Sequence, residues 1–258
     1  SELREFLSPQ EFALFEKVYG LSEPNNFEDG THILNLQDEY DWTIKANPLI
    51  RSAHHKLLAV RQARPSPLKD DKILTAWNGL MIAAMAKANQ VLGEARFLDA
   101  ARRAAQFLKQ NLMSDRGLLR RYRDGEATFD GYLDDYAYLI SGLLTLYETD
   151  FDLSWIDWAR ELQAKQDELL WNEQLGAYYF SRAGGPHLIR RSVDFVDGAR
   201  PNSNAVSALN LFKLFALTFH APYQEKAKTL LIANGGNLSR QPGAFAQTLI
   251  ALDYHLDR

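Results

Sequence analysis

Residues 136–147 read YAYLISGLLTLY, an almost wholly apolar run that is long enough for about three turns of helix. Residues 77–88, 205–217 and 245–256 have the same character. A helix that is apolar on all sides is buried on all sides. The sequence therefore predicts four fully buried helices and an all-α fold.

Amphipathic segments follow three of these four. Apolar side chains recur every three or four positions over residues 94–112 and 154–170, and more weakly over 222–231. A buried helix followed by a half-exposed one thus recurs roughly every 60 to 70 residues, which indicates a repeated helical hairpin.

Such hairpins can close into an (α/α)6-type toroid, in which outer helices surround a ring of parallel inner ones, or stack into an open solenoid. We predict the toroid, because solenoid helices usually keep a visible polar face. Residues 9–18, 39–46 and 48–64 bring the total to about ten helices. The prediction is one toroid domain over residues 1–258, short of six full hairpins.

Two stretches break the helical period. Residues 117–128 alternate around Asp124-Gly125, a strong hairpin signal. Residues 176–195 predict a second hairpin, with its turn at residues 183–186. Each stretch precedes a buried helix, so we expect both β-hairpins at the rim where the inner helices begin.

Composition narrows the range of partners. The 258 residues carry 29 Lys and Arg against 33 Asp and Glu, a formal charge of −4, which argues against a nucleic-acid partner. Cysteine is absent, which excludes disulfides, cysteine-ligated zinc and a thiol nucleophile. No apolar run reaches about 18 residues and no leader is visible, so we expect a cytoplasmic protein without a membrane partner.

Polar and aromatic residues collect where the buried helices begin. If those helices are parallel, these residues converge on one end of the ring. The residues concerned are Asp70, Asp71, Trp77, Asn78, Tyr132, Asp134, Asp135, Tyr136, Asp197 and Asn204. Helix capping alone explains one Asp, Asn or Ser at each helix. It explains less well the two adjacent acidic pairs and the aromatic residues among them.

Acids, amides and aromatic rings in a concave rim suit a sugar, because carboxylates and amides bind hydroxyl groups and ring faces cover the apolar side of a pyranose. We predict Asp71, Asp134 and Asp135 as acid/base residues, with Asp71 paired against one of the other two. The remaining rim residues, together with Arg121 of the basic first hairpin, are predicted to bind substrate. No sequence pattern indicates a metal or a cofactor.

Several motifs resemble a known family. They are DDKILTAWNGLMI at 70–82, NFE at 26–28, GYLDDYA at 131–137 and DGARPNSN at 197–204. They are similar to motifs of the YyaL family, thioredoxin-domain-containing proteins related to spermatogenesis-associated protein 20. In the last motif, Asn202-Ser203-Asn204 stands where the family has Ser-Gly-Asn, which alters the floor of the expected pocket.

The resemblance implies an N-terminal thioredoxin-like domain followed by an α/α toroid similar to six-hairpin glycosidases and N-acylglucosamine 2-epimerases. This chain corresponds to the toroid, and the thioredoxin-like domain of the same full-length protein is its expected partner. Two functions remain open: a carbohydrate-binding or carbohydrate-modifying domain, either glycoside hydrolase or sugar isomerase, and a non-catalytic interaction domain that accompanies the thioredoxin-like domain.

Overall fold

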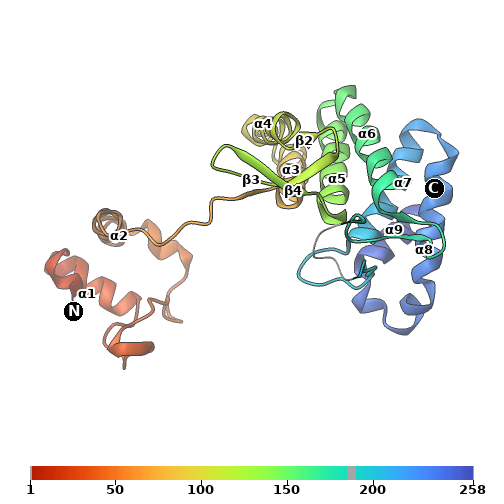
Figure 1. The fold of residues 1–258 in the computed structure, drawn as a ribbon. Helices are drawn as coiled ribbons and strands as arrows, with labels where there is room; N and C mark the ends of the chain where they lie inside the picture. Colours follow the sequence, from red (N-terminus) through yellow and green to blue (C-terminus); the bar gives the residue numbers. More distant parts are fainter. Residues whose placement is uncertain (1, 185–189, 258) are drawn as a thin grey trace. The chain divides into compact units, whose positions relative to one another are not determined.

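The computed structural model describes residues 2–184 and 190–257 (Figure 1). The contacts of the chain divide it into two compact units, Ser1–Asp70 and Asp71–Arg258. Each unit has a hydrophobic core of its own. The single toroid domain over residues 1–258 stays a prediction.

The first unit is a small helical body. Its elements are η1 (Glu2–Glu5), α1 (Pro9–Val18), η2 (Glu28–Gly30), η3 (Trp42–Ala46) and α2 (Pro48–Ala63). Ser8 begins α1 in a capping box with Glu11. The Glu11 carboxylate also accepts hydrogen bonds from Ser52 and Lys56 of α2, which lowers the pKa of Glu11 to about 2. This contact joins the two longest helices of the unit.

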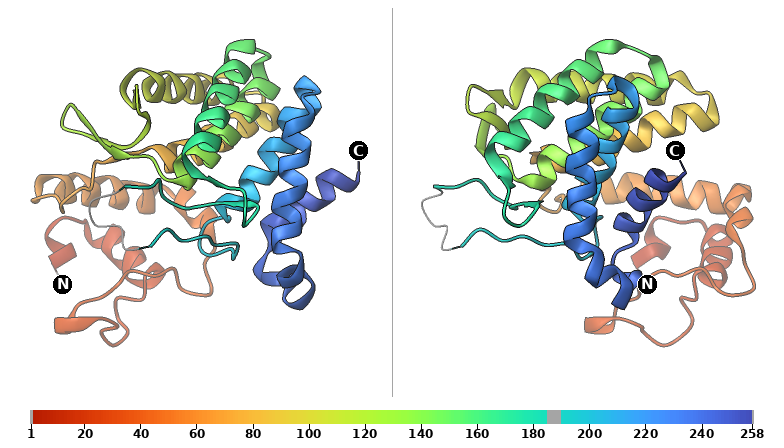
Figure 2. Two further views of the ribbon diagram at one scale, coloured as in Figure 1. Left: turned by 45° about the vertical axis from the view of Figure 1, so that its right-hand side comes forward. Right: turned by 90° about the vertical axis from the view of Figure 1, so that its right-hand side faces the viewer.

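The second unit is built from helical hairpins (Figures 1 and 2). Its helices are α3 (Thr75–Leu92), α4 (Ala95–Asn111), α5 (Leu133–Asp150), α6 (Leu153–Leu170), α7 (Ser203–Thr218), α8 (Ala221–Arg240), η4 (Pro242–Ala244) and α9 (Ala246–Leu256). Helices α3, α5, α7 and α9 pack against one another in that order. Helices α4, α6 and α8 each pack against the inner helix that precedes them. The described part of this unit thus holds three complete hairpins and the first helix of a fourth.

The predicted inner helices are the observed ones, but they are not equally buried. Helix α5 is covered on every side, and α7 nearly so. In contrast, Trp77 and Met81 of α3 and Ile250 and Leu256 of α9 are more than half exposed. Helices α3 and α9 stand at the two ends of the series, where each has one inner neighbour instead of two. The prediction of four fully buried helices was therefore wrong for these two.

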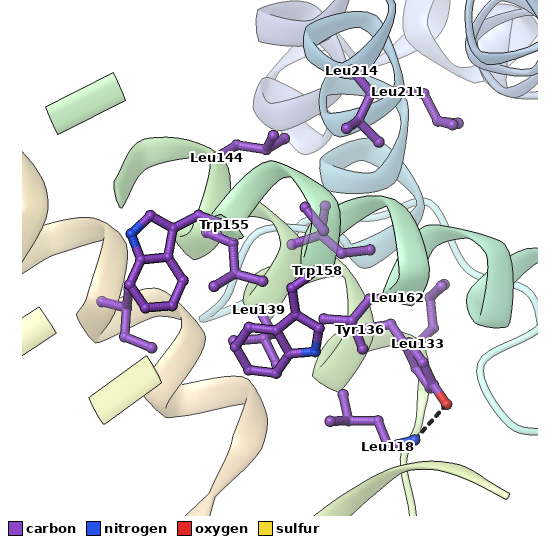
Figure 3. Close-up of a cluster of buried hydrophobic side chains, with 14 of the residues drawn as sticks. Leu118, Leu133, Tyr136, Leu139, Leu144, Trp155, Trp158, Leu162, Leu211 and Leu214 are labelled. Carbon is purple, nitrogen blue, oxygen red and sulfur yellow. Dashed lines mark hydrogen bonds between the residues drawn. The ribbon is translucent and has the colours of Figure 1, made fainter. Parts of the chain in front are cut away.

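The core lies where α5 meets α6 and its inner neighbours (Figure 3). Trp158 of α6 is 1% exposed and lies beside Leu139 and Tyr136 of α5 (Figure 3). The Tyr136 hydroxyl accepts a hydrogen bond of 2.9 Å from the Leu118 N–H (Figure 3). This bond ties the first β-hairpin to the start of the most buried helix.

Two glycines let α3 and α5 approach at backbone distance. A Cβ atom added at Gly79 would lie 2.5 Å from the backbone of Tyr138 and Leu139. One added at Gly142 would lie 2.6 Å from the Gly79 carbonyl oxygen. Any larger side chain at either position would force the helices apart.

The first predicted β-hairpin is confirmed, and it belongs to a small sheet. Its strands are β1 (Ile73–Leu74), β2 (Met113–Ser114), β3 (Gly117–Arg123) and β4 (Glu126–Asp130). Strand β3 lies in the middle and pairs antiparallel with each of the other three. Asp124 and Gly125 form the turn, both at positive φ. The sheet therefore connects the start of α3 to the start of α5.

The second predicted hairpin differs from the observed structure. Ala177–Tyr178 (β6) pairs with the preceding Trp171–Asn172 (β5), in a hairpin that closes at residues 173–176. Part of the turn predicted at residues 183–186 lies outside the described residues. On its flanks, the Phe180 N–H donates to the Ser192 carbonyl. Residues 190–202 then run without regular structure to α7.

Among the described residues, no helix combines the length and the hydropathy needed to cross a lipid bilayer.

Candidate functional site

A cavity of about 510 Å³ opens at the N-terminal ends of α5 and α7. Pockets of 300–1,000 Å³ commonly hold small molecules. Helix α5 supplies one wall and the segment that leads into α7 supplies the other. The lining residues are Leu133, Asp134, Tyr138, Phe180, Ser192, Asp194, Val196, Gly198, Ala199, Arg200, Pro201, Asn202, Ser203 and Asn204.

Asp134 is the carboxylate of α5 in this lining. Its Oδ1 accepts a hydrogen bond of 3.0 Å from Arg120, and its Oδ2 accepts one of 2.7 Å from Arg200. The carboxylate is 1% exposed, whereas the Arg200 side chain is 44% exposed. A charged group that is buried to this degree is stable only when it is paired. The two guanidinium groups supply that pairing.

Asp135 points away from the cavity into the contact between α5 and α3. Its Oδ2 accepts hydrogen bonds from Arg120 and from the Tyr132 N–H, and its Oδ1 accepts one from the Ala76 N–H. Burial, and then the neighbouring Asp134 carboxylate, raise the pKa of Asp135 to about 7. Asp135 therefore connects three elements and has no surface in the cavity.

Tyr132 and Tyr136, both predicted to bind substrate, lie close to this pair of carboxyl groups. The Tyr132 ring lies 4.7 Å from the Arg120 guanidinium and 5.1 Å from the Phe180 ring. Tyr136 is buried, and its hydroxyl is engaged by the Leu118 N–H, so it supports the fold beneath the site. Of the aromatic residues near α5, Tyr138 and Phe180 line the cavity itself.

Asp197 and Asn204 fix the segment that forms the second wall. The Asp197 carboxylate accepts from the Asn202 N–H at 2.7 Å and from the Gln247 N–H at 2.8 Å, which links this segment to the start of α9. The Asn204 side chain bonds the backbone of Tyr178 in both directions and the Asp194 carbonyl. Both residues therefore hold the wall in place through backbone contacts.

The other predicted residues lie outside the lining. Asp70 is the last residue of the first unit, and Asp71 forms an ion pair of 2.9 Å with Arg123 near the hairpin turn. Trp77 is 60% exposed on α3, and the Asn78 amide bonds the Leu74 carbonyl. The Arg121 guanidinium contacts Thr128 and the Phe129 ring. The structure thus brings Asp134 and Asn204 into one cavity, with Asp194 rather than Asp71 as the second carboxylate.

Sequence reasoning assigned neither Arg120 nor Arg200 to substrate binding or catalysis. Strand alternation could have indicated Arg120, because it shares a face of β3 with Leu118 and Tyr122, which pack into the core. Arg200 lies within the DGARPNSN motif, three residues before α7 begins. No periodic pattern extends into that segment, so its approach to Asp134 depends on the tertiary fold.

The cavity therefore combines two carboxylates, the buried Asp134 and the exposed Asp194, with a half-exposed guanidinium and aromatic and hydroxyl side chains. The carboxylates accept hydrogen bonds, and the guanidinium donates them. The ring of Phe180 provides an apolar surface. Polyhydroxylated ligands need this combination of acceptors, donors and apolar surface.

Two kinds of comparison relate the chain to known proteins, and no family model matches it. The rat protein "Spermatogenesis-associated protein 20" is 36% identical over 93% of this chain and 34% of its own length. The human protein of the same name is 34% identical over the same shares. This chain is homologous to part of spermatogenesis-associated protein 20. It spans about a third of the length of these relatives.

Solved structures show the fold. The α-1,6-mannanase GH76A of Salegentibacter sp. aligns with a TM-score of 0.53 at 14% identity, over 74% of this chain and 54% of that one. Cellobiose 2-epimerase from Bacillus thermoamylovorans aligns with a TM-score of 0.53 at 16% identity, over 64% and 45%. The family 105 glycoside hydrolase of C. acetobutylicum also has a TM-score of 0.53, at 12% identity over 74% and 59%. The α/α-toroid fold that the sequence predicted is therefore confirmed.

Proposed function

We propose that the second unit is a carbohydrate-binding or carbohydrate-modifying toroid domain and that its sugar ligand occupies the cavity beside Asp134. The observation that carries this proposal is the placement of Asp134, Asp194 and Arg200 in one cavity of about 510 Å³. In this role Asp134 and Asp194 accept hydrogen bonds from sugar hydroxyls and Arg200 donates them. Glycosidases use a pair of carboxyl groups, one as an acid and the other as a base or nucleophile.

The names of the structural neighbours support the choice of ligand. The Salegentibacter mannanase structure is described as an inactive variant, in which two adjacent aspartates are replaced by alanine, in complex with α-1,6-mannotetrose. This chain has an adjacent pair, Asp134 and Asp135, at the start of α5. We infer that Asp134 contacts the ligand and that Asp135 supports it from behind.

A non-catalytic role is the alternative. Both oxygens of Asp134 are already held by arginines, and Asp135 lies in the interior. An arrangement of this kind can also serve as a structural clamp between α5 and the segment before α7. In that case the domain is a non-catalytic interaction module of a YyaL-family protein, and its partner is the thioredoxin-like domain of the same full-length protein. The protein is then expected in the cytoplasm.

A thermal-shift screen separates the two functions. The probes are D-mannose, α-1,6-mannotriose and cellobiose. A sugar at about ten times its Kd raises the Tm of the wild-type chain by about 3–5 °C, because ligand binding stabilises the folded state. Asp134→Asn abolishes that rise, whereas Asp157→Asn, on the exposed surface of α6, keeps it. The sugar proposal fails if none of the three probes shifts the Tm of the wild-type chain.

A further inference from the structure

Arg120 occupies a central position beside the candidate site. Its Nη1 donates to Asp134 Oδ1 at 3.0 Å and to Asp135 Oδ2 at 2.9 Å. One nitrogen atom therefore bridges the carboxylate in the cavity and the carboxyl group behind it. This nitrogen carries two hydrogens, one for each carboxyl group.

The surroundings fix the guanidinium in this position. Arg120 lies in the middle of β3, which is paired on both sides by β1 and β4. Its guanidinium carbon lies over the Tyr132 ring, 4.7 Å from the ring centroid, and its side chain is 25% exposed. The neighbouring strands fix the backbone of Arg120, and the Tyr132 ring covers one face of its guanidinium. The guanidinium therefore has little freedom to turn.

We propose that Arg120 is the positioning residue of this site: it fixes the Asp134 carboxylate in the lining of the cavity and holds Asp135 behind it. This proposal rests on the proposed function, because it assigns Arg120 a role at the same cavity. Arg120 acts through Asp134 and does not itself line the cavity.

The two carboxyl groups that share the Arg120 guanidinium have different electrostatic surroundings. Two adjacent carboxylates in a buried site repel each other, so they cannot both remain charged without a shared cation. Arg200 adds a second cation on the Asp134 side only. Asp135, which lacks that second cation and is buried, has the raised pKa of about 7.

The other titratable groups that face the pair belong to α5 and the segment before α7. They are the Tyr136 hydroxyl, which interacts with Asp135, and the Tyr138 hydroxyl, which interacts with Asp134, besides Arg200. Burial raises the pKa of Tyr138 to about 12, so its hydroxyl stays neutral near pH 7. Burial also raises the pKa of Tyr136 above its usual value. Neither hydroxyl therefore changes its charge near pH 7.

A carboxyl-carbon NMR titration tests the role of Arg120 without any sugar. The protein is labelled with ¹³C at the aspartate side chains, and the two signals are assigned with Asp134→Asn and Asp135→Asn. In the wild-type chain one carboxyl group of the pair takes up a proton near pH 7. In Arg120→Met this midpoint rises by about one pH unit or more, because the shared cation is gone. Arg120→Lys, which has a charge but no planar fork, gives an intermediate midpoint.

Two further variants guard against trivial outcomes. Arg116 lies just before β3, is exposed and pairs with Asp130. We expect Arg116→Met to leave the midpoint of the carboxyl titration unchanged. If Arg120→Met does not fold, the charge-balanced Arg120→Met/Asp135→Asn double variant replaces it, and its Asp134 signal must titrate at a higher pH than that of Asp135→Asn alone. The positioning role is overturned if Arg120→Met titrates as the wild type does. A normal titration shift without any sugar binding would instead contradict only the proposed function.

Discussion

Asp135 is the residue whose ionisation has the clearest consequence for stability. Its pKa of about 7 in the folded chain exceeds its ordinary value of 3.8, so the folded state takes up a proton between these values while the unfolded state does not. The contribution of this group to the free energy of unfolding is fully present below about pH 4 and is lost as the pH rises through 7.

Replacement of Asp135 by Asn removes this dependence. We expect the wild-type second unit to lose stability between pH 5 and pH 8, and the loss to be smaller in Asp135→Asn. Urea unfolding, followed by tryptophan fluorescence, to which the buried Trp158 contributes, measures both chains at several pH values. If the free energy of unfolding changed with pH to the same extent in both chains, Asp135 would be ionised throughout this range.

How far sequence reasoning could identify the site is also decided residue by residue. Asp134 and Asn204 were predictable because each lies next to the start of an apolar helix, and parallel helices bring their starts together. Asp71 satisfied the same rule, but its side chain pairs with Arg123 on the hairpin. No binding or catalytic role was predicted for Arg200, because its contact with Asp134, 66 positions away in the sequence, depends on the irregular segment before α7.

At the scale of elements, the contact between α3 and α5 depends on glycine. A methyl group at Gly79 would meet the α5 backbone at 2.5 Å, and backbone atoms cannot move aside as a flexible side chain can. We expect Gly79→Ala to destabilise the second unit by about 3 kcal/mol, at the upper end for overpacking. Thermal or urea unfolding measures the change.

A glycine on an open helix face is the matched control. Gly235 lies inside α8, and nothing would contact an added Cβ there. Alanine has a helix propensity about 1 kcal/mol better than glycine, so Gly235→Ala stabilises the chain by up to that amount. If both alanine variants changed stability in the same direction, propensity rather than close packing would govern the α3–α5 contact.

The elements themselves were largely predictable, and the reasons are local. Continuous apolar runs marked the inner helices, and Asp124-Gly125 marked the first hairpin. The second hairpin was misplaced because its observed strands, Trp171–Asn172 and Ala177–Tyr178, are two residues each and follow directly after α6. A strand of two residues is too short to show the alternation of apolar and polar residues by which strands are predicted.

At the scale of the whole molecule, the two compact units have separate cores. Within the described residues, the core of the first unit contains six buried apolar side chains, far fewer than the core of the second. Small cores are only marginally stable. We therefore expect two transitions in urea, the first of which removes part of the helical circular dichroism but keeps most of the near-ultraviolet tryptophan signal, because four of the five tryptophans belong to the second unit. A single transition seen by both signals would show that the units unfold together.

Titration calorimetry with α-1,6-mannotriose tests the central claim, that a sugar binds in the cavity at the starts of α5 and α7. Ser203 lines this cavity at the first position of α7, and Ser203→Phe fills the space without removing a charge. The account predicts one binding site per wild-type chain and at least tenfold weaker binding by Ser203→Phe, with an unchanged Tm. Binding of equal strength in the two chains, or no binding to the wild type, would contradict it.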